Sequence, residues 1–124
     1  MRVLLDTHVL LWALSQPAKL SKATRNQINA AEVFVSAASI WEIGIKSALG
    51  KLRATADEIL EAVGPAGFRM LSITGEHAAK AANLPPLHKD PFDRLLAAQA
   101  CVEPMILITN DKVLQGYGAF VTLV

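Results

Sequence analysis

The sequence has one cysteine, few histidines and no long hydrophobic run. Cys101 is the only cysteine among 124 residues, so no disulfide can form within the chain, and we expect a reducing compartment, the cytoplasm. One cysteine and three scattered histidines cannot supply the ligand cluster of a zinc site. Asp6 and His8 interrupt the apolar N-terminal stretch, and no small-residue cleavage site follows, so we expect no signal peptide. No apolar run approaches the roughly 18 residues of a membrane-spanning helix.

The sequence also lacks a strong charge of either sign, internal repeats and low-complexity linkers. A net charge of +1 neither requires nor excludes a nucleic-acid partner. The length suits a single domain spanning residues 1–124. Hydrophobic residues are abundant, at 52%, and a small domain leaves much of its surface exposed. We therefore expect some apolar surface to meet a partner, either a second copy or another protein.

Short apolar runs alternate with amphipathic segments along the whole chain. The segments predicted as strands are 3–5, 33–36, 69–73, 105–108 and 119–124. The segments predicted as helices are 7–14, 21–31, 37–49, 55–63, 74–82 and 91–102, with Gly50 ending one of them. This alternation predicts an α/β fold in which helices cover both faces of a mostly parallel sheet of four to five strands.

Four acidic residues follow predicted strands or begin the helices after them. Asp6 follows the first strand, and Glu42 lies in the second turn of the helix after the second strand. Asp93 lies in the first turn of its helix, and Asp111 follows the fourth strand. Parallel strands end at one edge of the sheet, where open α/β folds place their sites. Carboxylates that converge there must be protonated or bind a cation, and oxygen ligands favour Mg²⁺ or Mn²⁺.

Each acid also has a purely structural explanation. Asp6 could cap the first helix, Asp93 could return a capping hydrogen bond at the start of its helix, and Asp111 could cap a short turn. Glu42 completes a Ser39-x-x-Glu42 capping box, which is weakened because the residues before it suit an earlier helix start with Ser36 as the cap. Glu42 could also pair with Lys46. Four such explanations at one edge are less economical than a single site.

The segment HKDPFDRLLAAQA contains two aspartates with different expected roles. Asp90 followed by Pro91 is the pairing expected at a helix start. Asp93 shares a helix face with Leu96 and Ala97, which is the packing face. An inward carboxylate is unfavourable unless it is paired or binds a ligand, so Asp93 is the candidate for chemistry.

The motifs VLLDTHVLLW, SAASIWEIGIKSALGKL, HKDPFDRLLAAQA and LITND resemble, in order and spacing, the acidic motifs of PIN-domain ribonucleases, above all the VapC-type toxins of toxin–antitoxin operons. The resemblance covers essentially the whole chain and implies a three-layer α/β/α PIN-like fold. Carried over by position, the catalytic and metal-binding acids are Asp6, Glu42, Asp93 and Asp111. Thr7, Ser36 and Thr109 resemble groups that orient carboxylates or metal-bound water, with capping as the alternative.

The resemblance implies Mg²⁺- or Mn²⁺-dependent hydrolysis of RNA that leaves a 5′-phosphate, in a homodimer whose groove an antitoxin covers. Basic residues would then surround the acidic site; the candidates are Lys19, Lys22, Arg25, Lys46, Lys51, Arg53 and Arg94. The candidates for protein contacts are Trp12, Trp41, Ile45 and Leu49, for which core packing is the alternative.

Two other function classes remain open from the residues alone. A receiver-like or phosphoryl-transfer α/β domain also binds Mg²⁺ with aspartates at strand ends, although it would place two acids together after the first strand. A catalytically silent PIN fold could serve as a binding module, but the full set of four acids disfavours it.

Overall fold

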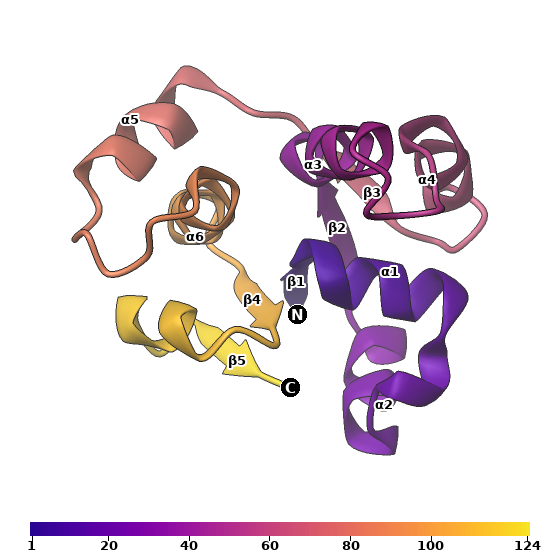
Figure 1. Cartoon of the computed structure of the whole chain (residues 1–124). Helices are drawn as coiled ribbons and strands as arrows, with labels where there is room; N and C mark the ends of the chain where they lie inside the picture. The colour runs from indigo at the N-terminus through magenta and orange to yellow at the C-terminus, as the bar shows by residue number, and fades with distance from the viewer.

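In a computed structural model that describes residues 1–124, five parallel strands form one sheet between two layers of helices (Figure 1). The sheet has the order β3-β2-β1-β4-β5. Its strands are β1 (Arg2–Leu5), β2 (Glu32–Ser36), β3 (Arg69–Leu71), β4 (Ile106–Thr109) and β5 (Val121–Leu123). The predicted three-layer α/β/α fold is confirmed, and every strand pair in the sheet is parallel.

Six α-helices and two short 3₁₀ helices connect the strands. The α-helices are α1 (Thr7–Ser15), α2 (Lys22–Ala30), α3 (Ala37–Ala48), α4 (Ala56–Val63), α5 (Gly75–Asn83) and α6 (Pro91–Val102). The 3₁₀ helices are η1 (Pro17–Lys19) and η2 (Lys112–Tyr117). Ser36 caps α3, so the Ser39 capping box is not formed, and Asp90 caps α6 as predicted. Gly50, with φ of 74°, follows α3 in the left-handed region that favours glycine.

Alternating side chains of the strands build a core on each face of the sheet. Val3 and Leu5 of β1 pack with α1, α2, α3 and α4, whereas Leu4 packs with α6 and η2 on the other face. Figure 1 shows α5 and α6 on the opposite side of the sheet from α1 and α2. None of the helices has both the length and the hydropathy needed to cross a bilayer.

The strand register determines which residues meet at the carboxyl edge. Leu5 pairs with Val35 of β2 on one side and with Ile108 of β4 on the other. The next residues along the chain are Asp6 and Thr109, and the backbone N–H of Asp6 donates to the carbonyl of Ile108 at 3.0 Å. The end of β1 therefore lies between the start of α3 and the residues that follow β4.

Candidate active site

A polar cavity of about 350 Å³ opens at this edge, and none of its ten lining residues is hydrophobic. The four acids singled out in the sequence all line it, and Asp90 is a fifth carboxylate there. The lining residues are Asp6, Thr7, His8, Glu42, Lys46, Asp90, Asp93, Asn110, Asp111 and Lys112. Residues far apart in the chain are thus brought together around one space.

Asp6 is buried at the junction of β1 and α1 and has two hydrogen-bond donors. The backbone N–H of Val9 donates to Oδ1 at 2.9 Å, and the hydroxyl of Thr109 donates to Oδ2. Burial raises the pKa of Asp6 above its ordinary value, although the hydrogen bonds from Thr109 and Val9 oppose this change. Asp6 therefore caps α1 and lines the cavity at the same time.

Glu42 is buried on α3, where a hydroxyl donates a hydrogen bond to it and an ammonium group neutralises its charge. Thr7 Oγ1 donates to Glu42 Oε1 at 2.5 Å and lies 3.1 Å from Ser39 Oγ. Lys46 Nζ lies 2.9 Å from Glu42 Oε2, so the i,i+4 ion pair considered from the sequence is present. The hydrogen bond to Glu42 raises the pKa of Lys46.

Asp93 is the least compensated carboxylate in the cavity. Its side chain is 20% exposed, and its one polar side-chain contact is Oδ2 at 3.3 Å from His88 Nε2. Burial, followed by the charge of Asp90, raises its pKa to about 7, although His88 opposes this increase. Asp90 instead has a structural role, because its Oδ1 accepts hydrogen bonds from the N–H groups of Phe92 and Asp93 at 2.8 and 3.3 Å.

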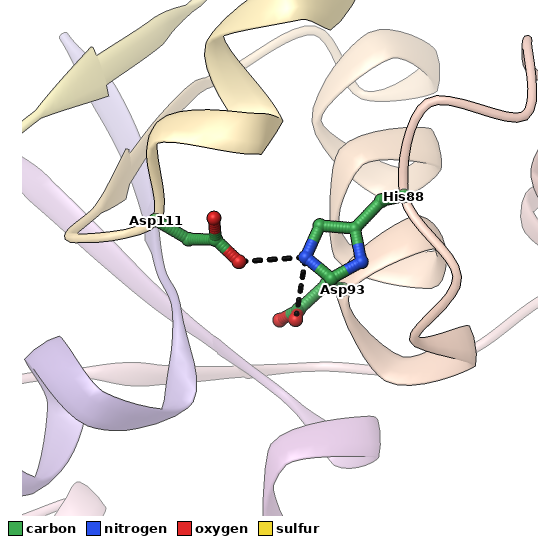
Figure 2. A group of neighbouring side chains, drawn as sticks. All are labelled: His88, Asp93 and Asp111. Carbon is green, nitrogen blue, oxygen red and sulfur yellow. Dashed lines mark hydrogen bonds and ion pairs between the residues drawn. The ribbon is translucent and has the colours of Figure 1, made fainter.

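Asp111 follows β4 and is held by two donors. Its Oδ1 accepts from the backbone N–H of Val113 at 2.9 Å, which caps η2. Its Oδ2 lies 2.6 Å from His88 Nε2 (Figure 2). Burial alone would raise the pKa of Asp111, but the hydrogen bonds from His88 and Val113 outweigh it and hold the pKa below its ordinary value.

Comparisons with known proteins agree with this architecture. A family model of the PIN domain matches residues 3–119. The chain belongs to the PIN domain family. Ribonuclease VapC22 of Mycobacterium tuberculosis (strain ATCC 25618 / H37Rv) is 32% identical over 123 residues, which cover 93% of this chain and 91% of that protein.

Two solved structures share the PIN fold at low sequence identity. A toxin–antitoxin complex from Klebsiella pneumoniae matches with a TM-score of 0.67 and 17% identity, covering 97% of this chain and 95% of that one. VapBC2 from Rickettsia felis, bound to a DNA fragment from its promoter, matches with a TM-score of 0.71 and 14% identity. That match covers 100% of this chain and 98% of the other.

The donor set of this PIN domain fits a hard divalent cation. Every carboxylate of the cavity offers oxygen ligands, which Mg²⁺ and Mn²⁺ prefer. Burial and the charge of Asp90 raise the pKa of Asp93 to about 7, and its one polar side-chain contact is His88, so its ionised form is unfavourable without a compensating charge. Lys46 is already paired with Glu42. A cation among these groups would neutralise the remaining negative charge.

The three predicted orienting hydroxyls differ in what they contact. Thr7 contacts Glu42, and Thr109 donates to Asp6 while accepting from the backbone N–H of Asp111 at 3.0 Å. The hydroxyl of Ser36 accepts from the N–H of Ala38 at 3.0 Å, which is the capping alternative.

Sequence reasoning missed the role of His88 and placed Arg94 wrongly. His88 lies outside the predicted helices and strands and has no predicted role, yet it contacts two of the acids; its position just before the Asp90-Pro91 helix start was the available signal. Arg94 is not part of a basic rim around the cavity, because its guanidinium donates to the backbone carbonyls of Ala81 and Leu84 at 2.6 and 3.1 Å.

Proposed function

We propose that this PIN domain is a VapC-type toxin, an endoribonuclease that depends on Mg²⁺ or Mn²⁺ and is inhibited by a cognate antitoxin. The convergence of Asp6, Glu42, Asp93 and Asp111 on one cavity is the observation that carries the proposal. Membership of the PIN family and the 32% identity to a protein named as a ribonuclease support the reaction class. The toxin–antitoxin complexes among the structures of the same fold support the choice of partner.

In this proposal, Asp6, Glu42 and Asp93 hold the cation, and Asp111 completes the cluster. When bound, the cation supplies positive charge to the scissile phosphate and lowers the pKa of a coordinated water. Thr109 fixes the orientation of Asp6, and Thr7 fixes that of Glu42. Lys112 is an exposed ammonium on the cavity wall that can contact an RNA phosphate, which a purely acidic surface would repel.

Exposed apolar residues on α3 and α4 are our candidates for contacts with an antitoxin or with a second copy of the chain. Trp41 is 66% exposed, and Ile45 on the same helix and Leu49 directly after it are also exposed. A hollow of about 420 Å³ beside Trp41 is lined mainly by apolar side chains, including Leu60 of α4. Trp12, in contrast, is half-buried against the core, so packing explains it better than a partner does.

Cleavage of RNA by the purified chain, freed of any antitoxin, tests the proposal. We expect cleavage with Mn²⁺ or Mg²⁺, products that carry a 5′-phosphate, and no cleavage with EDTA. Asp6→Asn should abolish cleavage, with circular dichroism confirming that the variant is folded. Cleavage that persists in EDTA, or in the Asp6→Asn variant, would contradict the proposed use of the cavity.

Since RNA is the proposed substrate and Cys101 is unpaired, we place this activity in the cytoplasm.

A further inference from the structure

The imidazole of His88 lies between two carboxylates from different parts of the chain. Figure 2 shows its ring between Asp111, which follows β4, and Asp93 on α6. Nε2 is 2.6 Å from Asp111 Oδ2 and 3.3 Å from Asp93 Oδ2, and the His88 side chain is only 14% exposed. The ligand atoms of the three residues lie within 4.8 Å of one another. His88 could therefore act as a metal ligand or as a hydrogen-bond donor to the two acids.

The other ring nitrogen decides between these roles. His88 Nδ1 accepts a hydrogen bond from the backbone N–H of Asp90 at 3.0 Å. A backbone N–H can only donate, so Nδ1 must carry a lone pair, and the proton of the ring is on Nε2. To bind a metal, Nε2 would need its lone pair, so the ring proton would have to be on Nδ1. Two N–H donors, those of Nδ1 and of the Asp90 backbone, would then face each other. The backbone thus selects the tautomer that donates toward Asp111 and Asp93.

The loop that carries His88 is held in place by side chains from elsewhere in the fold. The N–H of His88 donates to the hydroxyl of Tyr117 at 3.0 Å. The guanidinium of Arg94 lies 3.3 Å from the same hydroxyl and donates to the carbonyls of Ala81 and Leu84. These contacts fix the backbone at His88 and before it, so the position of its imidazole is set by the fold.

We propose that His88 is a positioning residue of the carboxylate site, which acts as an Nε2–H donor and does not bind the cation. This role of His88 rests on the proposed function, because it requires that the cavity binds Mg²⁺ or Mn²⁺. With Val113 N–H on Oδ1 and His88 on Oδ2, both oxygens of Asp111 are oriented. The same donor faces Asp93 and reduces the repulsion between the two acids, which keeps them close enough to serve one cation.

Nitrogen NMR of the ¹⁵N-histidine-labelled protein tests the tautomer without RNA or catalysis. The chemical shifts report which ring nitrogen carries the proton, and the spectrum of a His88→Gln variant identifies the His88 signals among those of the three histidines. We expect a protonated Nε2 in EDTA and also after saturation with Mg²⁺. A proton on Nδ1 in either condition would overturn the proposal, because it would leave Nε2 free to bind the metal.

Mn²⁺ affinity, measured by calorimetry, tests the positioning role. His88→Ala should weaken binding by about 10- to 100-fold, the range for removal of a group that orients a metal ligand. His88→Gln, whose amide N–H reaches a similar point, should restore most of the affinity. Lys89→Ala, at an exposed neighbour in the same loop, is the matched control and should bind as the wild type does.

The outcomes separate this proposal from the proposed function. Unchanged Mn²⁺ affinity in His88→Ala, or a Gln variant as weak as the Ala variant, would overturn the positioning role. If the wild type does not cleave RNA, but the tautomer and the difference in Mn²⁺ affinity between the Ala and Gln variants are as expected, the proposed nuclease function is wrong. His88 would then still be the positioning residue of a metal site. Absence of Mn²⁺ binding to the wild type would overturn both.

Discussion

Replacing Asp93 with asparagine should stabilise the metal-free protein while removing its activity. The folded protein raises the pKa of Asp93 from 3.8 to about 7, with burial as the largest cause and the charge of Asp90 as the next. At about 1.36 kcal/mol per pKa unit, the ionised carboxylate would destabilise the fold by roughly 4 kcal/mol. Because the side chain is 20% exposed, water screens part of this effect, and we expect about 2 kcal/mol.

The pH dependence of this effect has a definite sign. The folded state binds the Asp93 proton more tightly than the unfolded state, so wild-type stability falls as the pH rises from about 4 to about 7. The asparagine variant carries no such proton. It should therefore match the wild type near pH 4 and exceed it at pH 8, where about 2 kcal/mol corresponds to roughly 6–10 °C in Tm for a domain of this size.

Thermal and urea unfolding in EDTA at pH 4.5 and pH 8, followed by circular dichroism, provide the assay. Asp90→Asn is the comparison variant, because asparagine caps a helix as well as aspartate does; it removes only the second cause of the raised Asp93 pKa, so it should stabilise the protein at pH 8 by less than Asp93→Asn does. A variant at Asp93 that is less stable than the wild type at pH 8, or a stability difference that does not change with pH, would refute the reasoning. Asp93 would then have a compensating partner in the folded protein.

Three further predictions concern the cation, one of the two cores and a buried histidine. Mn²⁺ at 100 times its Kd should stabilise the wild type by about 2.7 kcal/mol and so raise its Tm. It should not raise the Tm of Asp93→Asn, and calorimetric melting measures both proteins. Leu96→Ala should destabilise the protein by about 2–5 kcal/mol in urea unfolding, because this side chain is fully buried between α6 and the sheet. Glu103→Ala should destabilise it by about 1–3 kcal/mol, because buried His77 Nε2 loses the acceptor that lies 2.5 Å away.

Most elements of the fold could be predicted from sequence, because their signals are local. The start of α6 follows from the Asp90-Pro91 pairing, and the end of α3 follows from Gly50. The edge strands were predicted too long for a reason that is not local. β3 ends at Leu71, which pairs with Ser36, and α3 begins directly after Ser36. Residues beyond Leu71 therefore have no strand to pair with.

The convergence of the acids could be predicted, but the contacts of His88 with Asp93 and Asp111 could not. Parallel strands bring Asp6 and Asp111 to one edge whatever their loops do. The His88 contact depends instead on the path of a loop that Arg94 and Tyr117 hold through tertiary hydrogen bonds. A basic residue such as Arg94 next to an acidic site suggests phosphate binding in a sequence, and only the fold reveals that it binds backbone carbonyls.

The cleavage of RNA by Asp93→Asn and Asp90→Asn, measured side by side under single-turnover conditions with Mn²⁺, tests the central claim most directly. Both substitutions remove one carboxylate from the same cavity wall, and they lie three residues apart. We expect no detectable product from Asp93→Asn and a rate close to that of the wild type from Asp90→Asn. An active Asp93→Asn beside an inactive Asp90→Asn would contradict the assignment of Asp93 to the metal site.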